Sequence, residues 1–200
     1  FDMKAMTSVY SPHSMLLNLA CAEMMAHYGL PHSGTSGCVN GWGADLQLAG
    51  TLWMNHLTAC MGKVGLAPFV GGSFDSLAFA PTVVVYADQV IRQARQFSAG
   101  FSLAAEEVAL DQIDTIGAAG NFLMAPQTLS RFRDQAGGGL WPSQTLEQWV
   151  AEAGPSADGY LRNHTIDLLT GLAPPTDHDD LMARGETFIQ PFETVKLSSV

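Results

Sequence analysis

Residues 31–45 read Pro-His-Ser-Gly-Thr-Ser-Gly-Cys-Val-Asn-Gly-Trp-Gly-Ala-Asp, a glycine-rich stretch between two segments of different periodicity. The run at residues 30–34 is short enough for a strand, although it contains few β-forming residues. After the loop, Asp45 is suited to cap a helix, and an apolar stripe with helical spacing follows at residues 46–60. This stretch therefore predicts a strand, a long loop and a helix in succession.

The same succession repeats further along the chain. Residues 65–70 indicate a buried strand, residues 71–80 a loop, and residues 81–94 a helix with one apolar face. Strands that alternate with helices of this length imply parallel β/α units. Residues 1–125 hold two clear units and part of a third, whereas a complete eightfold barrel needs about 250 residues. We therefore predict an α/β fold, with residues 1–125 as the C-terminal part of a (β/α)8 TIM barrel.

Beyond this point the sequence predicts helices without strands. Apolar residues recur at helical spacing in residues 143–154, 157–172 and 177–189. We therefore expect residues 126–200 to form a helical C-terminal extension of the barrel.

The composition argues against several classes of function. The chain has 200 residues, a net charge of -10 and only nine Lys and Arg residues, which form no basic patch for nucleic acid. No apolar run reaches the ~18 residues that a membrane span needs. Three cysteines are an odd, sparse set that favours a reducing cytoplasm over a disulfide framework. Because Phe1 is neither an initiator Met nor the start of a signal peptide, we expect it to lie inside a longer protein.

Ligands of parallel β/α folds bind at the C-terminal ends of the strands, on the loops that lead into the helices. Three segments meet this condition, namely residues 1–11, 33–45 and 71–80. Trp42 and Phe74 could form an aromatic wall for a quaternary ammonium group, or each could simply pack its loop. Three acidic residues of these loops could bind a ligand or serve as caps and turn residues: Asp2, Asp45 and Asp75.

Other chemistries stay open at the second loop. His32, Cys38 and Asp45 could bind zinc, but their spacing matches no zinc motif, so we expect no metal site. A Cys38–His32 nucleophile pair is an alternative, as is an unrelated barrel hydrolase that uses Cys38 or Asp45. Phe122 follows a turn and could reach the barrel mouth or lie in the core.

Several short segments occur in an order that is more specific than any one of them. They are Phe1-Asp2-Met3-Lys4, Ser11-Pro12, Tyr28-Gly29-Leu30-Pro31, Gly34-Thr35, residues 47–50, Gly71-Gly72, Asn121-Phe122-Leu123 and Gln127-Thr128. Together they resemble the corrinoid-dependent trimethylamine methyltransferase family, of which the chain would be a C-terminal fragment.

The resemblance implies a barrel enzyme that passes a methyl group from a methylated amine to the Co(I) of a separate corrinoid-binding protein. The enzyme itself would hold no cofactor. Trimethylamine enzymes carry pyrrolysine just after the Gly-Thr that resembles Gly34-Thr35, so the resemblance puts the catalytic position at Ser36 or Gly37. The loops and the resemblance together predict nine substrate-binding residues: Asp2, Gly34, Thr35, Trp42, Asp45, Gly71, Gly72, Phe74 and Phe122.

Two departures from the family bear on the substrate. Pyrrolysine is absent, and Pro81-Thr82-Val83 begins the helix where many members carry a Glu-Gln pair. A quaternary ammonium leaves as a neutral tertiary amine and needs no proton, whereas a neutral amine must first be protonated. We therefore expect glycine betaine or a similar trimethylammonium compound as substrate. The alternative is a non-catalytic homologue or a binding protein for such a compound, and homo-oligomerisation stays open.

Overall fold

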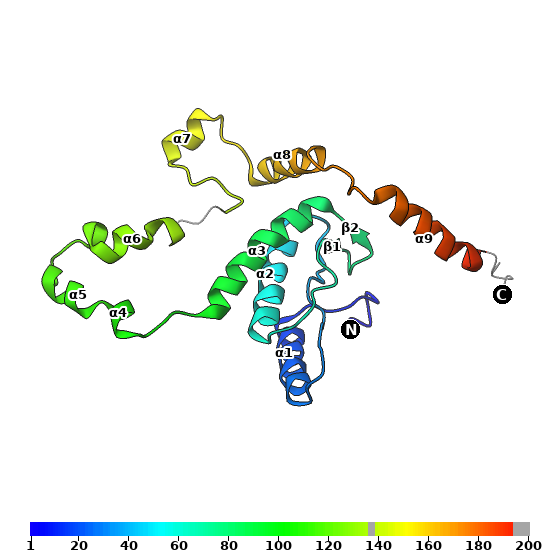
Figure 1. The fold of residues 1–200 in the computed structure, drawn as a ribbon, viewed down its shortest axis with the longest axis horizontal. Coiled ribbons are helices and arrows are strands. Elements are labelled where there is room, and N and C mark those ends of the chain that lie inside the picture. Colours follow the sequence, from blue (N-terminus) through cyan, green and yellow to red (C-terminus); the bar gives the residue numbers. More distant parts are fainter. Residues whose placement is uncertain (136–138, 194–200) are drawn as a thin grey trace. The chain divides into compact units, whose positions relative to one another are not determined.

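The computed structural model of the protein describes residues 1–135 and 139–193. Contacts within the chain divide it into two units, Phe1–Thr165 and Ile166–Val200. Figure 1 traces the elements of both units. The sequence predicts a different boundary, between barrel residues 1–125 and a helical extension at residues 126–200. That boundary stays a prediction.

Three long helices come first in the chain: α1 (Pro12–His27), α2 (Leu46–Met61) and α3 (Pro81–Ala99) (Figure 1). The side chain of Asp45 caps α2, because its Oδ1 accepts a hydrogen bond of 2.8 Å from the Leu48 N–H. The predictions of helices α2 and α3, and of the Asp45 cap, are therefore confirmed.

Helices α2 and α3 pack together around a small apolar core. Its fully buried members are Val39, Leu48, Leu52, Val83, Ala87 and Val90. The three from α3 recur every three or four residues and therefore lie on one face of the helix. Val39 belongs to the glycine-rich loop, so the same core anchors that loop to the helices.

The prediction of parallel strands at residues 30–34 and 65–70 is wrong, since the structure assigns no strand to either segment. Within the described residues the strands are β1 (Gly72–Ser73) and β2 (Ala78–Phe79), which pair in an antiparallel hairpin. The mainly helical structure therefore does not display the expected barrel sheet.

The two expected strands nevertheless run side by side in the same direction. The Gly65 N–H donates to the His32 carbonyl at 3.2 Å, and the Phe69 N–H donates to the Ser36 carbonyl at 3.3 Å. No ladder develops between these bonds, because Gly34 has a left-handed φ of +54° and Pro68 has no N–H to donate.

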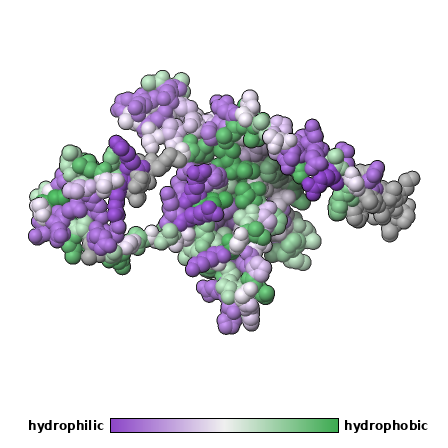
Figure 2. Space-filling model, viewed as in Figure 1, coloured by the Kyte–Doolittle hydropathy of each residue, from purple (hydrophilic) through white to green (hydrophobic). Residues whose placement is uncertain are grey.

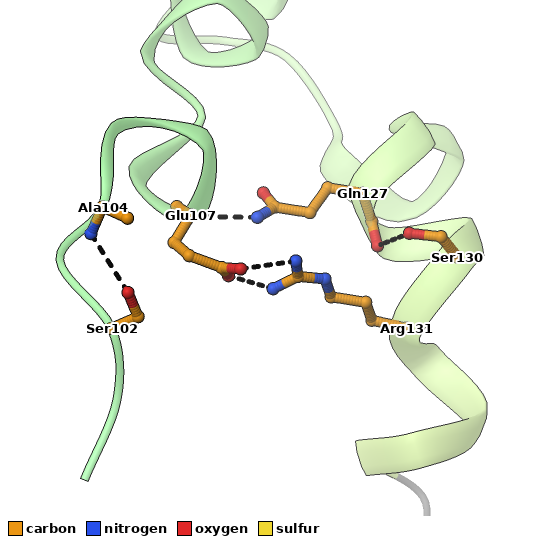
Figure 3. Close-up of polar contacts among 6 residues, drawn as sticks. All are labelled: Ser102, Ala104, Glu107, Gln127, Ser130 and Arg131. Atoms are coloured by element: carbon orange, nitrogen blue, oxygen red, sulfur yellow. Dashed lines mark hydrogen bonds and ion pairs between the residues drawn. The ribbon is translucent and has the colours of Figure 1, made fainter.

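A second group of helices is short: α4 (Ala105–Val108), α5 (Leu110–Ile116), the 3-10 helix η1 (Phe122–Met124) and α6 (Pro126–Gln135). Polar contacts connect α4 with α6 (Figure 3). The Glu107 carboxylate accepts hydrogen bonds from the Arg131 guanidinium, and Gln127 Nε2 donates to the Glu107 carbonyl at 3.0 Å.

The predicted C-terminal helices are also present, as α7 (Leu146–Ala151), α8 (Ala157–Thr170) and α9 (His178–Glu193). Leu161 and Thr165, one turn apart on α8, are buried. No helix within residues 1–135 or 139–193 is both long and apolar enough to cross a membrane.

Apolar side chains are also abundant on the surface. The space-filling view shows the widest apolar area over the middle of the molecule, whereas polar residues predominate around α4 to α6 (Figure 2). Exposed apolar residues near the two expected strands include Leu30 and Leu66, whose exposed fractions are 56% and 67%.

Candidate functional site

The three loops expected at the barrel mouth lie together, although they are far apart in the sequence. The Ser8 N–H donates to Asp75 Oδ2 at 3.2 Å, and the Tyr10 hydroxyl donates to Oδ1 of the same carboxylate. Asn40 Nδ2 donates to the Ser8 carbonyl at 2.8 Å. Residues 1–11 are therefore bonded to both of the other loops.

Direct bonds also connect the second and third loops. The Phe74 N–H donates to the Gly41 carbonyl at 2.9 Å, and the Asp75 N–H donates to the Val39 carbonyl at 3.2 Å. We call the meeting point of the three loops the loop junction, defined by Ser8, Tyr10, residues 38–41 and residues 74–76.

The turn that carries Asp75 has an unusual backbone. Phe74, Asp75 and Ser76 have left-handed φ values of +50°, +57° and +63°. Residues other than glycine rarely adopt this conformation and are strained in it, so the surrounding structure must hold them there. The bonds to Val39 and Gly41 supply part of that restraint.

The loop junction carries a negative charge beside a neutral phenol. The hydrogen bond from the Tyr10 hydroxyl, with further help from the Ser8 N–H, lowers the pKa of the Asp75 carboxyl. Burial and the neighbouring Asp75 raise the pKa of the Tyr10 hydroxyl. At neutral pH, Asp75 is therefore ionised and Tyr10 is protonated, an arrangement that favours a cationic ligand.

The side chain of Asn55, on α2, holds the glycine-rich loop in place. Its Oδ1 accepts a 2.8 Å hydrogen bond from the Gly37 N–H, and its Nδ2 donates to the carbonyls of Thr35 at 2.9 Å and Cys38 at 3.2 Å. Asn55 is 2% exposed, and a buried amide with three backbone partners fixes the loop conformation. Asn55 was not predicted from the sequence; the available signal was a polar residue within an otherwise apolar helix face.

The two predicted catalytic positions, Ser36 and Gly37, belong to the loop that Asn55 holds. Ser36 is buried, and its hydroxyl donates to the Ser33 carbonyl at 2.9 Å. Gly37 has a φ of +92°, and a Cβ atom there would lie 2.6 Å from the backbone of Phe69 and Val70. Position 37 therefore has no room for a side chain, and the catalytic assignment of both residues stays a prediction.

A small cavity with both polar and apolar walls adjoins this loop. Its volume of about 10 Å³, lined by Asn18, His32, Thr35 and Asn55 among others, suits about one water molecule. Asn18 Nδ2 donates to Thr35 Oγ1 at 2.5 Å, whereas the buried Nε2 of His32 has no hydrogen-bond partner in the described structure. Gly34 lies at the rim of the cavity.

The predicted aromatic residues Trp42 and Phe74 come close through their backbones, because Phe74 bonds to the residue before Trp42. Trp42 is 76% exposed and Phe74 is 49% exposed, so neither residue is buried by packing. Their role in substrate binding stays a prediction. The hydrogen bond from Phe74 to Gly41 does bring the second and third loops together.

The remaining predicted residues have structural partners. Asp2 Oδ1 accepts hydrogen bonds from the Lys4 and Ala5 N–H groups within its own turn. Gly71 has a φ of +92°, and a Cβ atom there would lie 2.6 Å from the Phe79 ring; Gly72 pairs with Phe79 in the hairpin.

Phe122 lies outside the loop junction. It is 43% exposed on η1 and lines another pocket with residues of α5 and α6, Ile113 and Gln127 among them. The described residues contain no group of three His, Cys, Asp or Glu side chains arranged to hold a metal ion.

Comparison with known proteins gives a family match over most of the chain. Residues 2–190 match the family model described as trimethylamine methyltransferase (MTTB). The chain belongs to the trimethylamine methyltransferase family. The family resemblance expected from the ordered short segments is thereby confirmed.

Two relatives show how similar the chain is to other members of the family. It is 23% identical over 193 residues to the trimethylamine methyltransferase MttB of Desulfitobacterium hafniense, covering 96% of this chain and 39% of that protein. It is 24% identical over 190 residues to the trimethylamine methyltransferase MttB2 of Methanosarcina mazei, covering 90% of this chain and 37% of that protein. The chain therefore spans less than two fifths of either relative's length.

Proposed function

We propose that this family member transfers a methyl group from a quaternary ammonium compound, such as glycine betaine, to Co(I) in a corrinoid carried by a partner protein in the cytoplasm. The loop junction carries this proposal, because it combines the ionised Asp75 with the neighbouring exposed rings of Trp42 and Phe74. A carboxylate and aromatic faces are the groups that favour a methylated cation.

The proposal includes a barrel. Residues 32–36 and 65–69 run parallel, and each is followed by a long helix, α2 or α3, as in consecutive β/α units. Exposed Leu30 and Leu66 would be covered once further strands paired with these segments. We infer that the chain supplies C-terminal units of a (β/α)8 barrel, followed by a helical extension.

The reaction balances without a proton donor. The cobalt electron pair forms the new bond to the methyl carbon, and the C–N bond breaks with its electron pair on nitrogen. A quaternary ammonium then departs as a neutral tertiary amine. Because the positive charge on nitrogen falls in the transition state, the site must hold the cation without excessive affinity. Asp75 suits this role, since hydrogen bonds from Ser8 and Tyr10 already occupy both of its oxygens.

A second function, binding without catalysis, is favoured by one observation. The Ser36 hydroxyl is engaged with the Ser33 carbonyl, and position 37 cannot accommodate a side chain. Neither predicted catalytic position therefore offers a free reactive group, so a binding protein for a trimethylammonium compound is the alternative.

Anaerobic methyl transfer tests the proposal. The chain is mixed with a corrinoid protein reduced to Co(I) and with glycine betaine. In parallel, a chimera is tested in which the chain replaces the segment of the D. hafniense relative that it matches. We expect the chimera to consume the Co(I) absorption and to form an equal amount of dimethylglycine. No reaction with betaine, choline or trimethylamine, while methyl iodide still methylates the same Co(I), would contradict it.

A further inference from the structure

A larger pocket lies beside the N-terminus of α2, apart from the loop junction. Its volume is about 470 Å³, which is ample for a small organic ligand. The start of α2, one residue of α3 and residues 141–161 form its walls. The lining residues that matter here are Asp45, Ala49, Tyr86, Trp141, Asp158 and Leu161.

Aromatic rings form one side of this pocket. The ring centroids of Tyr86 and Trp141 are 6.3 Å apart with an interplanar angle of 53°. Tyr160 continues the series, 6.1 Å from Trp141 and tilted by 47°. Rings tilted in this way form a bent wall, and a cation within about 6 Å of a ring centroid is attracted to its face.

The charges of the lining have one sign. Among the described lining residues, Asp45 and Asp158 carry the carboxylates, and none is Lys, Arg or His. The position of the Asp45 carboxylate is fixed by hydrogen bonds from the Trp42 N–H at 2.7 Å and the Leu48 N–H at 2.8 Å. Asp158 has only an exposed ion pair with Arg162 at 3.5 Å, which screening makes weak.

The apolar residues of the lining favour one kind of cation over others. Ala49 and Leu161 offer apolar surface and no hydrogen-bond acceptor to a ligand. A hydrated metal ion or a primary ammonium would lose hydrogen bonds on entering such a pocket. A cation whose charge is spread over methyl groups loses none, because it has no N–H to satisfy.

We propose that this pocket, whose lining includes the rings of Tyr86 and Trp141 and the carboxylates of Asp45 and Asp158, binds a methylated ammonium cation. This site goes beyond the proposed function, since it would bind such a cation whether or not the chain transfers methyl groups. We call it the aromatic pocket.

Calorimetric titration of the full chain with choline and with its neutral carbon isostere, 3,3-dimethylbutan-1-ol, tests the charge preference. The two probes have the same shape, so aromatic and acidic groups distinguish them by charge alone. We expect choline to bind about tenfold more tightly than the isostere. Equal affinity would overturn the proposal, because an apolar cavity would then suffice.

Substitutions locate the binding. Trp141→Leu and Tyr86→Leu should each weaken choline binding about tenfold. Phe97→Leu is the matched control, because Phe97 lies on the same helix as Tyr86, is 66% exposed and does not line the pocket. Asp75→Asn removes the charge of the loop junction, so the choline binding that persists in this variant reports on the aromatic pocket. Unaltered choline affinity in both ring variants would overturn the proposal.

Circular dichroism shows whether each ring variant folds. If one does not, a measurement on the unsubstituted protein replaces it. Nuclear Overhauser contacts between choline methyl protons and the Trp141 ring protons should be present, and their absence would overturn the proposal. Failure of methyl transfer in the chimera would leave these contacts intact, so the two proposals fail separately.

Discussion

The part of the molecule that holds α1 to α3 and the part that holds α4 to α6 are both helical, but different forces stabilise them. In the first, six apolar side chains that are at most 2% exposed pack between α2, α3 and the glycine-rich loop. In the second, Ala125 is the buried residue among those whose burial is described, and the Glu107–Arg131 pair connects the helices (Figure 3). Loops anchored to a core can hold a defined site, and the loop junction belongs to the first part.

The largest expected effect comes from the core of the first part. Leu52→Ala removes a fully buried side chain, so we expect unfolding free energy to fall by about 2–5 kcal/mol. Leu110→Ala, at a position 64% exposed in α5, is the control and should change it by less than about 0.5 kcal/mol. Chemical denaturation measures both, and equal losses would remove the distinction between the two parts.

A second effect depends on pH. Burial lowers the pKa of His56 to about 4, from an ordinary value of 6.5. Between these values the unfolded chain binds more protons than the folded one, so stability is full above pH 6.5 and declines as the pH falls toward 4. The loss should be about 3 kcal/mol over this range.

Denaturant titrations at several pH values measure this decline. His56→Gln should flatten the dependence between pH 6.5 and 4, even if that variant is less stable throughout. His27→Gln, at an exposed position on α1, should leave it unchanged. An unaltered slope in the His56 variant would assign the decline to other groups.

Removal of the Asn55 amide should have an intermediate effect. Asn55→Ala leaves the Gly37 N–H and the Thr35 and Cys38 carbonyls without their partner. We expect a loss of about 1–3 kcal/mol in stability, with faster amide exchange confined to residues 34–41. Hydrogen exchange measures the second effect, and protection unchanged in this loop would show that Asn55 does not hold it.

The smallest effect is expected in the second part. Glu107→Gln weakens the pair with Arg131, which is partly exposed and therefore partly screened by salt. The melting temperature should fall slightly at low ionic strength and not at all in molar salt. A loss as large as that of Leu52→Ala would mean that this ion pair, and not apolar burial, dominates stability.

The sequence predicted those features that depend on local spacing. The apolar stripe of α3 and the Asp45 cap involve neighbours within four residues, so their pattern is visible in the chain itself. The sequence also predicted that residues 1–11, 33–45 and 71–80 would lie together, and their hydrogen bonds show this contact, although the strands on which that prediction rested are not present in the described residues.

Features that depend on distant partners could not be predicted. The expected strands at residues 30–34 and 65–70 lack an uninterrupted ladder, since Gly34 and Pro68 break it. Asn55 is polar on an apolar helix, and its loop partners lie 17 to 20 residues away. The Tyr10–Asp75 bond joins residues 65 apart. Such contacts arise only once the loops have met.

The central claim, that the loop junction binds the methylated cation for transfer, is tested most directly by comparing the chimera with its Asp75→Asn variant. Initial rates of Co(I) consumption are measured over a range of glycine betaine concentrations. The loss of one charge beside the substrate should raise the KM for betaine about fivefold, with a smaller change in kcat. A KM that is the same in both proteins would contradict the assignment of the substrate site to the loop junction.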